Sequence, residues 1–218
     1  MALYVLFLVF ALQLLKPVSC TCSGYSGYSE DKYTVTNGWS SAPFSGRKKG
    51  GEKGVAWSES IAGKDLESRR LTSGIKKTIW HVASEKDVDP YIIVAIASRE
   101  SNFGSPGTLK NGWGDNGNGY GWMQVDKNVK NRIVDTTGPS SKNHFLQAVG
   151  ILVTSIKGVK NNHKDWEREY QIKGGIAGYN FGSSNVWTKD GIDRRTAGHD
   201  YSSDVLARAH FFRKERVF

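Results

Sequence analysis

A glutamate at the end of an apolar run is the first residue that could do chemistry. Residues 92–98, IIVAIAS, are apolar or small, and Glu100 follows Arg99. A carboxylate beside a core is costly unless it is paired or its pKa shifts. Desolvation, a helix dipole or a nearby carboxylate would raise that pKa, and a protonated acid can donate to a leaving oxygen. The alternative is a structural role, in a salt bridge with Arg99 or a contact with the following loop.

Two aspartates follow within a glycine-rich segment, residues 103–126, FGSPGTLKNGWGDNGNGYGWMQVD. Asp115 and Asp126 are candidate bases, and glycines let the backbone approach a ligand closely. Three aromatic residues are interleaved with them: Trp113, Tyr120 and Trp122. A proton donor, one or two bases and aromatic surfaces that suit sugar rings are what glycosidic bond cleavage requires. The alternative for each aspartate is loop stabilisation through an Asx-turn.

The elements that position these residues are predicted to be mostly helical. Asp89 is a natural cap and Pro90 fits a first turn, so a helix apolar on nearly all faces begins there and should be central and buried. The glycines and asparagines after Phe103 exclude helix and favour turns with a small irregular sheet. Residues 120–126, YGWMQVD, are its best candidate strand.

Helical periodicity and capping residues predict five further helices. They cover residues 58–71, 71–86, 142–161, 165–182 and 202–214. In the longest, the apolar stripe consists of Phe145, Val149, Leu152 and Ile156. Asp165 is the expected cap of the next helix and Gly182 its stop signal. The predicted fold class is therefore α+β and predominantly helical, with a small irregular β lobe.

The N-terminal residues predict secretion. Leu3 to Leu15 is an apolar block too short to span a bilayer, although no Lys or Arg precedes it. We expect a signal peptide over residues 1–20, cut after Cys20, with Ser19 or Cys22 as alternative sites and an uncleaved anchor as the alternative role. Cleavage would leave Cys22 as a free thiol. Residues 21–53 read as an extended leader with aromatic anchors, and residues 54–218 as the catalytic domain.

The composition limits the range of partners. The formal net charge is +9 and the sequence pI about 9.5, which for a secreted protein favours polyanionic partners such as microbial envelopes. No nucleic-acid-binding signature, metal-ligand spacing or cofactor motif is present, so we expect no nucleic acid, metal or cofactor. The sequence also lacks a basic amphipathic helix, so we expect no stable membrane insertion.

Three separated motifs occur in order along the chain: SRES (98–101) with LKNGWGDNGNGYGWMQVDK (109–127), then QIKGGIAGYNFGSSNV (171–186), then DYSSDVLARA (200–209). Together they resemble the goose-type lysozyme family. The resemblance runs from about Gly54 to the C-terminus. Two departures are visible: the N-terminal disulfides of avian members are absent, and the loop FGSPGT (103–108) is slightly longer.

The resemblance implies a lysozyme-like fold with the β lobe beside a cleft, and it implies residue roles. Glu100 matches the general acid, while Asp115 and Asp126 match the candidates for positioning or activating water. The remaining matches lie in or near the cleft: Gln124, Tyr179, Asn180 and Tyr201. With Trp113 and Tyr120, these form the expected substrate-binding set.

The implied reaction is hydrolysis, with inversion, of the β-1,4 bond between N-acetylmuramic acid and N-acetylglucosamine in peptidoglycan. Water would lie between donor and base, so the carboxyl groups should be roughly 6.5–9.5 Å apart. The alternatives are a lytic transglycosylase, which needs no aspartate base, a glycan-binding module without turnover, and a cationic membrane-active protein. Chitin oligomers stay open as a second substrate, and we expect a monomer.

Overall fold

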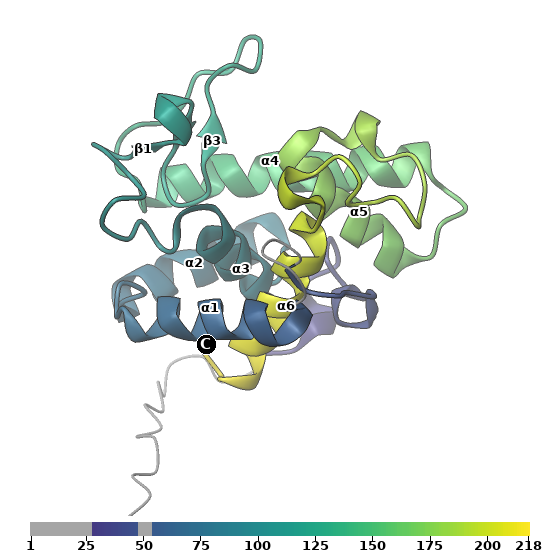
Figure 1. Cartoon of the computed structure of the whole chain (residues 1–218), viewed down its shortest axis with the longest axis horizontal. Coiled ribbons are helices and arrows are strands. Elements are labelled where there is room, and N and C mark those ends of the chain that lie inside the picture. Colours follow the sequence, from purple (N-terminus) through teal and green to yellow (C-terminus); the bar gives the residue numbers. More distant parts are fainter. Residues whose placement is uncertain (1–27, 48–53) are drawn as a thin grey trace, which may run out of the picture.

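Six α-helices and a small three-stranded sheet make up the computed structural model, which describes residues 28–47 and 54–218 (Figure 1). The helices are α1 (Gly54–Glu67), α2 (Ser73–Lys86), α3 (Pro90–Ser101), α4 (Lys142–Asn162), α5 (Arg168–Phe181) and α6 (Tyr201–Lys214). The strands are β1 (Trp113–Gly114), β2 (Gly119–Tyr120) and β3 (Val125–Asp126). The predicted α+β, predominantly helical fold is confirmed. The expected signal segment, its cleavage site and Cys22 lie outside the described residues.

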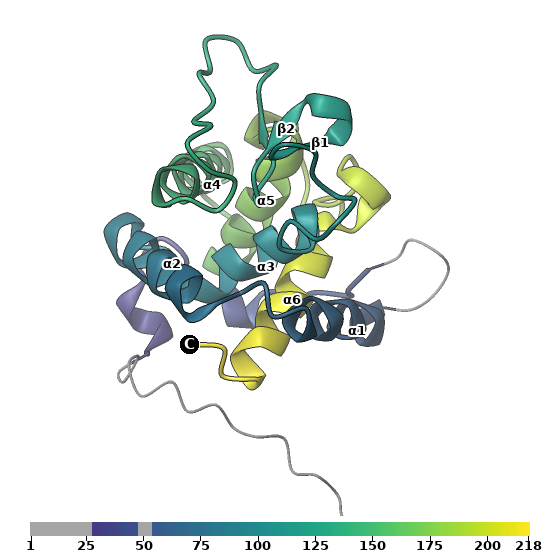
Figure 2. The ribbon, with the colours of Figure 1, turned by 90° about the vertical axis from the view of Figure 1, so that its left-hand side faces the viewer.

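Helix α3 runs through the middle of the fold, as its sequence predicts. Asp89 caps it, because the Asp89 carboxylate accepts a hydrogen bond from the Tyr91 amide at 2.9 Å, and Pro90 occupies the first turn. All residues from Pro90 to Ser98 are buried. Helix α6 packs along α3, and α4 packs chiefly on α5. Both views place the β lobe on one side of α3 and α1 on the other (Figures 1 and 2).

The β lobe differs from its prediction in one respect. The strands form an antiparallel sheet in the order β1-β2-β3, with Trp113 opposite Tyr120, and Gly119 opposite Asp126. The single strand expected over residues 120–126 is wrong, because residues 121–124 form a turn between β2 and β3. Gly121 and Gln124 have φ values of 75° and 49°, which are incompatible with an extended strand.

The boundaries of helices α1 and α5 also differ from the predictions. Helix α1 begins four residues early, at Gly54, and ends at Glu67, because Arg69 adopts a left-handed conformation with φ of 57°. Helix α5 begins at Arg168 with Glu167 as its cap residue, so the expected cap at Asp165 is wrong. Its end at Gly182 is confirmed, and the whole apolar stripe of α4 is buried as predicted.

The described part of the leader packs against the start of α3. It contains two short 3₁₀ helices, η1 (Glu30–Lys32) and η2 (Trp39–Ser41). The Tyr28 hydroxyl and the Trp39 indole both donate to Oδ2 of Asp89, at 2.7 and 2.9 Å, and the Asp89 amide donates to Thr36 Oγ1 at 2.8 Å. Trp39, Thr36 and Asp89 are fully buried. The leader therefore satisfies a buried carboxylate that caps the helix carrying Glu100.

Within the described ranges, no helix is both long and apolar enough to cross a bilayer.

Candidate active site

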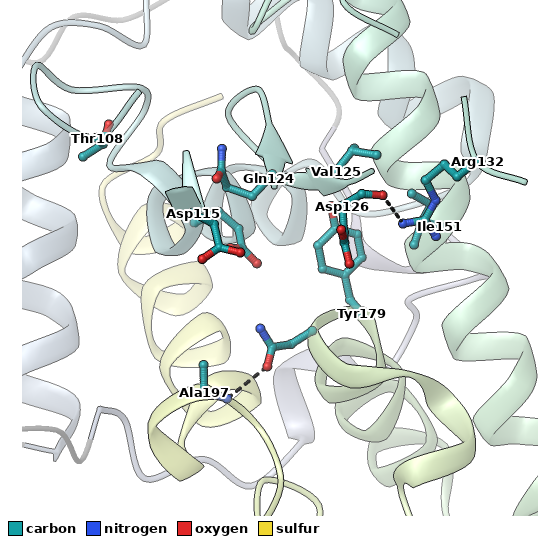
Figure 3. A pocket seen from close by; sticks show the side chains of 12 residues that line it. Thr108, Asp115, Gln124, Val125, Asp126, Arg132, Ile151, Tyr179 and Ala197 are labelled. Carbon is teal, nitrogen blue, oxygen red and sulfur yellow. Dashed lines mark hydrogen bonds between the residues drawn. The ribbon is translucent and has the colours of Figure 1, made fainter. Parts of the chain in front are cut away.

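A groove of about 470 Å³ separates the β lobe from the helices, and it contains all three candidate carboxylates. The residues that line it are Glu100, Thr108, Asp115, Gly119, Gln124, Val125, Asp126, Arg132, Ile151, Tyr179, Asn180 and Ala197. Thr108 and Asp115 lie toward one end of the groove and Arg132 and Ile151 toward the other (Figure 3). Helix α3 and the adjoining β lobe thus bring the candidate acid and the two aspartates to one cavity, and α4, α5 and the loop before α6 complete its walls.

Glu100 is half-buried in the last turn of α3, where it faces the groove. The Tyr201 hydroxyl donates to Glu100 Oε1 at 2.5 Å. Burial raises the pKa of the Glu100 carboxyl to about 7; the Tyr201 bond and Arg99 oppose this, while the charge of Asp115 adds to it. Two of the three effects expected from the sequence, desolvation and a nearby carboxylate, therefore act on this residue. A carboxyl with this pKa still holds its proton on a large fraction of molecules near neutral pH.

The two aspartates are exposed and reach the groove from different parts of the β lobe. Asp115 opens a 3₁₀ turn directly after β1, with φ of 46°, and Asp126 ends β3. Asp126 Oδ1 accepts a hydrogen bond from the Asn128 amide at 2.7 Å, so the Asx-turn considered as its alternative role is present. That bond engages one carboxylate oxygen, and the side chain still lines the groove (Figure 3).

Three of the expected substrate-binding residues line the same groove, each held by a hydrogen bond. The side-chain Nε2 of Gln124 donates to the Gly121 carbonyl at 2.7 Å. The Tyr179 hydroxyl donates to the Met123 carbonyl at 2.7 Å, which ties α5 to the β lobe. Asn180 Oδ1 accepts from the Ala197 amide at 3.0 Å, which ties α5 to the loop before α6. These bonds fix both walls of the groove.

The other three expected binding residues lie elsewhere. Tyr201 is buried and reaches the groove only through its bond to Glu100. Tyr120 is also buried, and its hydroxyl donates to the Thr136 carbonyl at 3.0 Å. Trp113 packs edge-on against Tyr120, with ring centroids 5.0 Å apart, and lines a neighbouring cleft of about 620 Å³ that shares Thr108 and Asp115 with the groove.

A buried ionic network ties three helices together at the C-terminal end of α3. Arg99 donates to Asp200 at 2.9 Å and to Asp204. Arg208 pairs with Asp204 at 3.2 Å and reaches Asp65 of α1 at 3.3 Å. Burial would raise the pKa of Asp204, but the charges and hydrogen bonds of its partners hold it below its usual value. Arg99 thus pairs with Asp200 and Asp204, and not with Glu100 as the structural alternative supposed, and these pairs connect α3 to α6 at the helix end that carries the candidate acid.

Sequence reasoning missed several groove residues, of which Arg132 is the most informative. It lies in the loop after β3, six residues beyond Asp126, with no motif around it. Arg132 Nη1 donates to the backbone carbonyl of Asp126 at 3.0 Å, and this contact places the Arg132 side chain at the groove. Ile151 faces the groove from α4 outside the stripe that the periodicity picked out. Neither position carries a local signal, because the fold alone brings each to the site.

In the part of the chain that the structure describes, no group of three or more His, Cys, Asp or Glu side chains is placed to hold a metal ion.

A helical fold with a small β lobe, and a groove with one half-buried carboxyl group of raised pKa and two exposed carboxylates, define a glycoside hydrolase of the lysozyme type. The family model described as "Lysozyme g" matches residues 31–216, and the chain belongs to this family. It is 43% identical to "Lysozyme G" of Dromaius novaehollandiae over 162 residues, 74% of this chain and 75% of that protein.

Fish relatives show the same relationship. The chain is 43% identical to "Lysozyme g" of Cyprinus carpio over 163 residues, 75% of this chain and 84% of that protein. It is 37% identical to "Lysozyme g" of Epinephelus coioides over 201 residues, 88% of this chain and 100% of that protein. The predicted family is therefore confirmed: the chain is a lysozyme, a glycoside hydrolase whose family implies peptidoglycan as substrate.

Proposed function

We propose that this lysozyme is a secreted, inverting muramidase that hydrolyses the β-1,4 bond between N-acetylmuramic acid and N-acetylglucosamine, in antibacterial defence or digestion. The observation that carries the proposal is the half-buried Glu100, with its raised pKa, in one groove with two exposed aspartates. Secretion rests on the apolar N-terminal block, and the basic charge suits an anionic wall.

Glu100 protonates the bridging oxygen, and the departing sugar takes that proton while the ring at the anomeric carbon flattens toward an oxocarbenium ion. Water held by Asp126, with help from Asp115, attacks the opposite face and loses its proton to the carboxylates. Tyr201 supports the acid, because burial raises the Tyr201 pKa well above its usual value and keeps its hydroxyl a donor. Gln124, Tyr179 and Asn180 bind the sugars from the groove walls, and Trp113, which packs on the buried Tyr120, extends this surface into the neighbouring cleft.

We infer a monomer that uses no cofactor. The large apolar side chains exposed in the described residues are Val129, Ile133 and Trp187, which are scattered over two loops and form no continuous stripe. Chitin oligomers are a second substrate to test, because they share the β-1,4 linkage and the N-acetylglucosamine unit.

The nature of the newly formed ends tests the reaction. The mature protein is incubated with purified peptidoglycan, and the products are separated and identified. Reducing α-anomeric ends are expected, because water attacks opposite the departing β-linked sugar. Anhydro ends would indicate transglycosylation, β-anomeric ends would indicate retention, and binding without new ends would indicate a glycan-binding module. Any of these three results would contradict the proposal.

The pH dependence of kcat/KM reports the acid directly. Glu100 must hold its proton to act, and its pKa is raised to about 7. We therefore expect kcat/KM to fall as pH rises through about 7, by roughly tenfold per unit well above it. The measurement is hydrolysis of soluble glycan strands at constant ionic strength from pH 5 to 9. A kcat/KM that stays constant from pH 6 to 9 would contradict the assignment.

If both aspartates hold the attacking water, the losses of activity caused by their substitution should be non-additive. We expect Asp115→Asn and Asp126→Asn each to be partly compensated by the remaining carboxylate. The double variant should then lose more activity than the product of the two single losses. Initial rates of the four proteins on the same glycan strands measure this coupling. A loss in the double variant that equals the product would show that the two carboxylates act independently.

A further inference from the structure

Arg132 is the one basic side chain among the described residues that line the groove. The same groove contains the carboxyl groups of Glu100, Asp115 and Asp126. A cavity lined by carboxylates repels an anionic ligand, and a fixed cation within it offsets that repulsion and attracts an anion. The charge at Arg132 therefore bears on which substrates can enter.

One hydrogen bond holds the guanidinium of Arg132 in place, and this bond leaves its other N–H donors available. The Nη1 bond to the Asp126 carbonyl, 3.0 Å long, uses one of five guanidinium N–H donors. The Arg132 backbone is held as well, because its amide donates to the Val129 carbonyl at 3.0 Å. Arg132 is half-buried, and it lies beside Ile151 at the Asp126 end of the groove (Figure 3). A guanidinium held this way is suited to bind a carboxylate, with two parallel hydrogen bonds where geometry allows.

The chemistry of the substrate supplies a carboxylate at the corresponding place. In the bond to be cleaved, the attacked anomeric carbon belongs to the muramic acid unit. That unit carries a lactyl group. The carboxyl group of the lactyl substituent is either a free carboxylate or is amide-linked to a peptide, and the peptide then bears carboxylates of its own. Arg132 contacts Asp126, the residue proposed to hold the attacking water. Arg132 should therefore lie beside the muramic acid unit, which is the sugar unit that carries the anionic substituent.

We propose that Arg132 is a specificity determinant that binds a carboxylate on the muramic acid substituent and so favours peptidoglycan over neutral glycans. This inference rests on the proposed muramidase function. A purely structural role would act through the Asp126 carbonyl alone. Displacing Asp126 would lower the rate of hydrolysis of every substrate by the same factor. Loss of a carboxylate contact would lower the rate only for substrates that carry the carboxylate.

Three substrates separate these roles: peptidoglycan strands stripped of peptide, the same strands with their lactyl carboxylates converted to methylamides, and peptide-bearing strands. We expect Arg132→Gln to lower kcat/KM roughly tenfold or more on carboxylate-bearing strands, the usual size of a hydrogen bond to a charged group. On the methylamide strands the loss should stay within about twofold. Arg132→Lys, which keeps the charge but not the fork of donors, should fall between Arg132→Gln and the unsubstituted protein.

Lys130→Gln is the matched control, because it removes the same charge from an exposed position in the same loop. It should leave all three rates within about twofold. Selective loss on stripped strands identifies the lactyl carboxylate as the ligand, and selective loss on peptide-bearing strands identifies the peptide. Equal losses on all three substrates, no loss, or the same selectivity in Lys130→Gln would overturn the inference. If the unsubstituted protein cleaves none of the strands, the proposed function itself fails.

Discussion

Replacing Glu100 with Gln is expected to lower turnover of peptidoglycan at least about 100-fold while the protein stays folded. Glutamine matches the size of the acid and can accept the Tyr201 hydrogen bond, but it cannot give a proton to the leaving oxygen. The measurement is kcat on purified strands, alongside a thermal unfolding curve for each protein. Full activity in the variant would remove Glu100 from the mechanism.

The stability of Glu100→Gln gives an independent check. The folded-state pKa of Glu100 is raised from 4.5 to about 7, so folding favours its protonated form. The stabilising contribution of this group is complete below the unfolded pKa and is lost as pH rises through the folded value. Glutamine does not ionise, so the variant should be at least as stable as the unsubstituted protein above pH 7. Glu67→Gln, at an exposed position of α1, is the matched control and should leave turnover unchanged.

Asp204→Ala is expected to lower the free energy of unfolding by about 3–5 kcal/mol, since it leaves the buried Arg208 and the half-buried Arg99 without their shared partner. Asp204 is fully buried and pairs with both Arg99 and Arg208. Urea unfolding at neutral pH measures the loss. Asp190→Ala, at an exposed position, is the control and should change the free energy of unfolding by less than about 0.5 kcal/mol.

Acid provides the second test of this network. The folded-state pKa of Asp204 is held below its usual value of 3.8, so its contribution is present above that value and lost as pH falls through the folded pKa. The difference between Asp204→Ala and the unsubstituted protein should therefore shrink in strong acid. A difference that is equally large at pH 7 and in strong acid would show that the loss comes from packing, with ionic pairing contributing little.

Local signals predicted the helices best. The Asp89-Pro90 start of α3 and the buried stripe of α4 both appear as predicted, because capping and periodicity act within a few residues. Errors occurred where the backbone departs from regular geometry. Gln124 adopts positive φ in the turn after β2, although glutamine is not a common turn residue, and Gly121 was the one turn signal in this segment. The boundary errors in α1 and α5 also lie at helix termini, where sequence signals define the first and last residues least well.

The residues of the candidate site likewise fall into two groups, those with a local sequence signal and those without one. Glu100, Asp115 and Asp126 stand out in the sequence because an apolar run and a glycine-rich segment frame them. Arg132 does not, because its importance depends on a loop that turns back to the Asp126 carbonyl. The network behind α3 was also missed. Asp65 and Arg208 are 143 positions apart, and no spacing rule relates them.

The contacts around Asp89 set a limit on how far the protein can be shortened. Tyr28, Thr36 and Trp39 precede α1, yet Tyr28 and Trp39 donate hydrogen bonds to this carboxylate and Thr36 accepts one from the Asp89 backbone amide. A recombinant form starting at Gly54 would carry every groove residue and still lack these partners. Shortened versions of the protein should therefore retain the chain from Tyr28 onward. During synthesis, these residues leave the ribosome well before the aspartate that they enclose, so they acquire their final places only after α3 has been made.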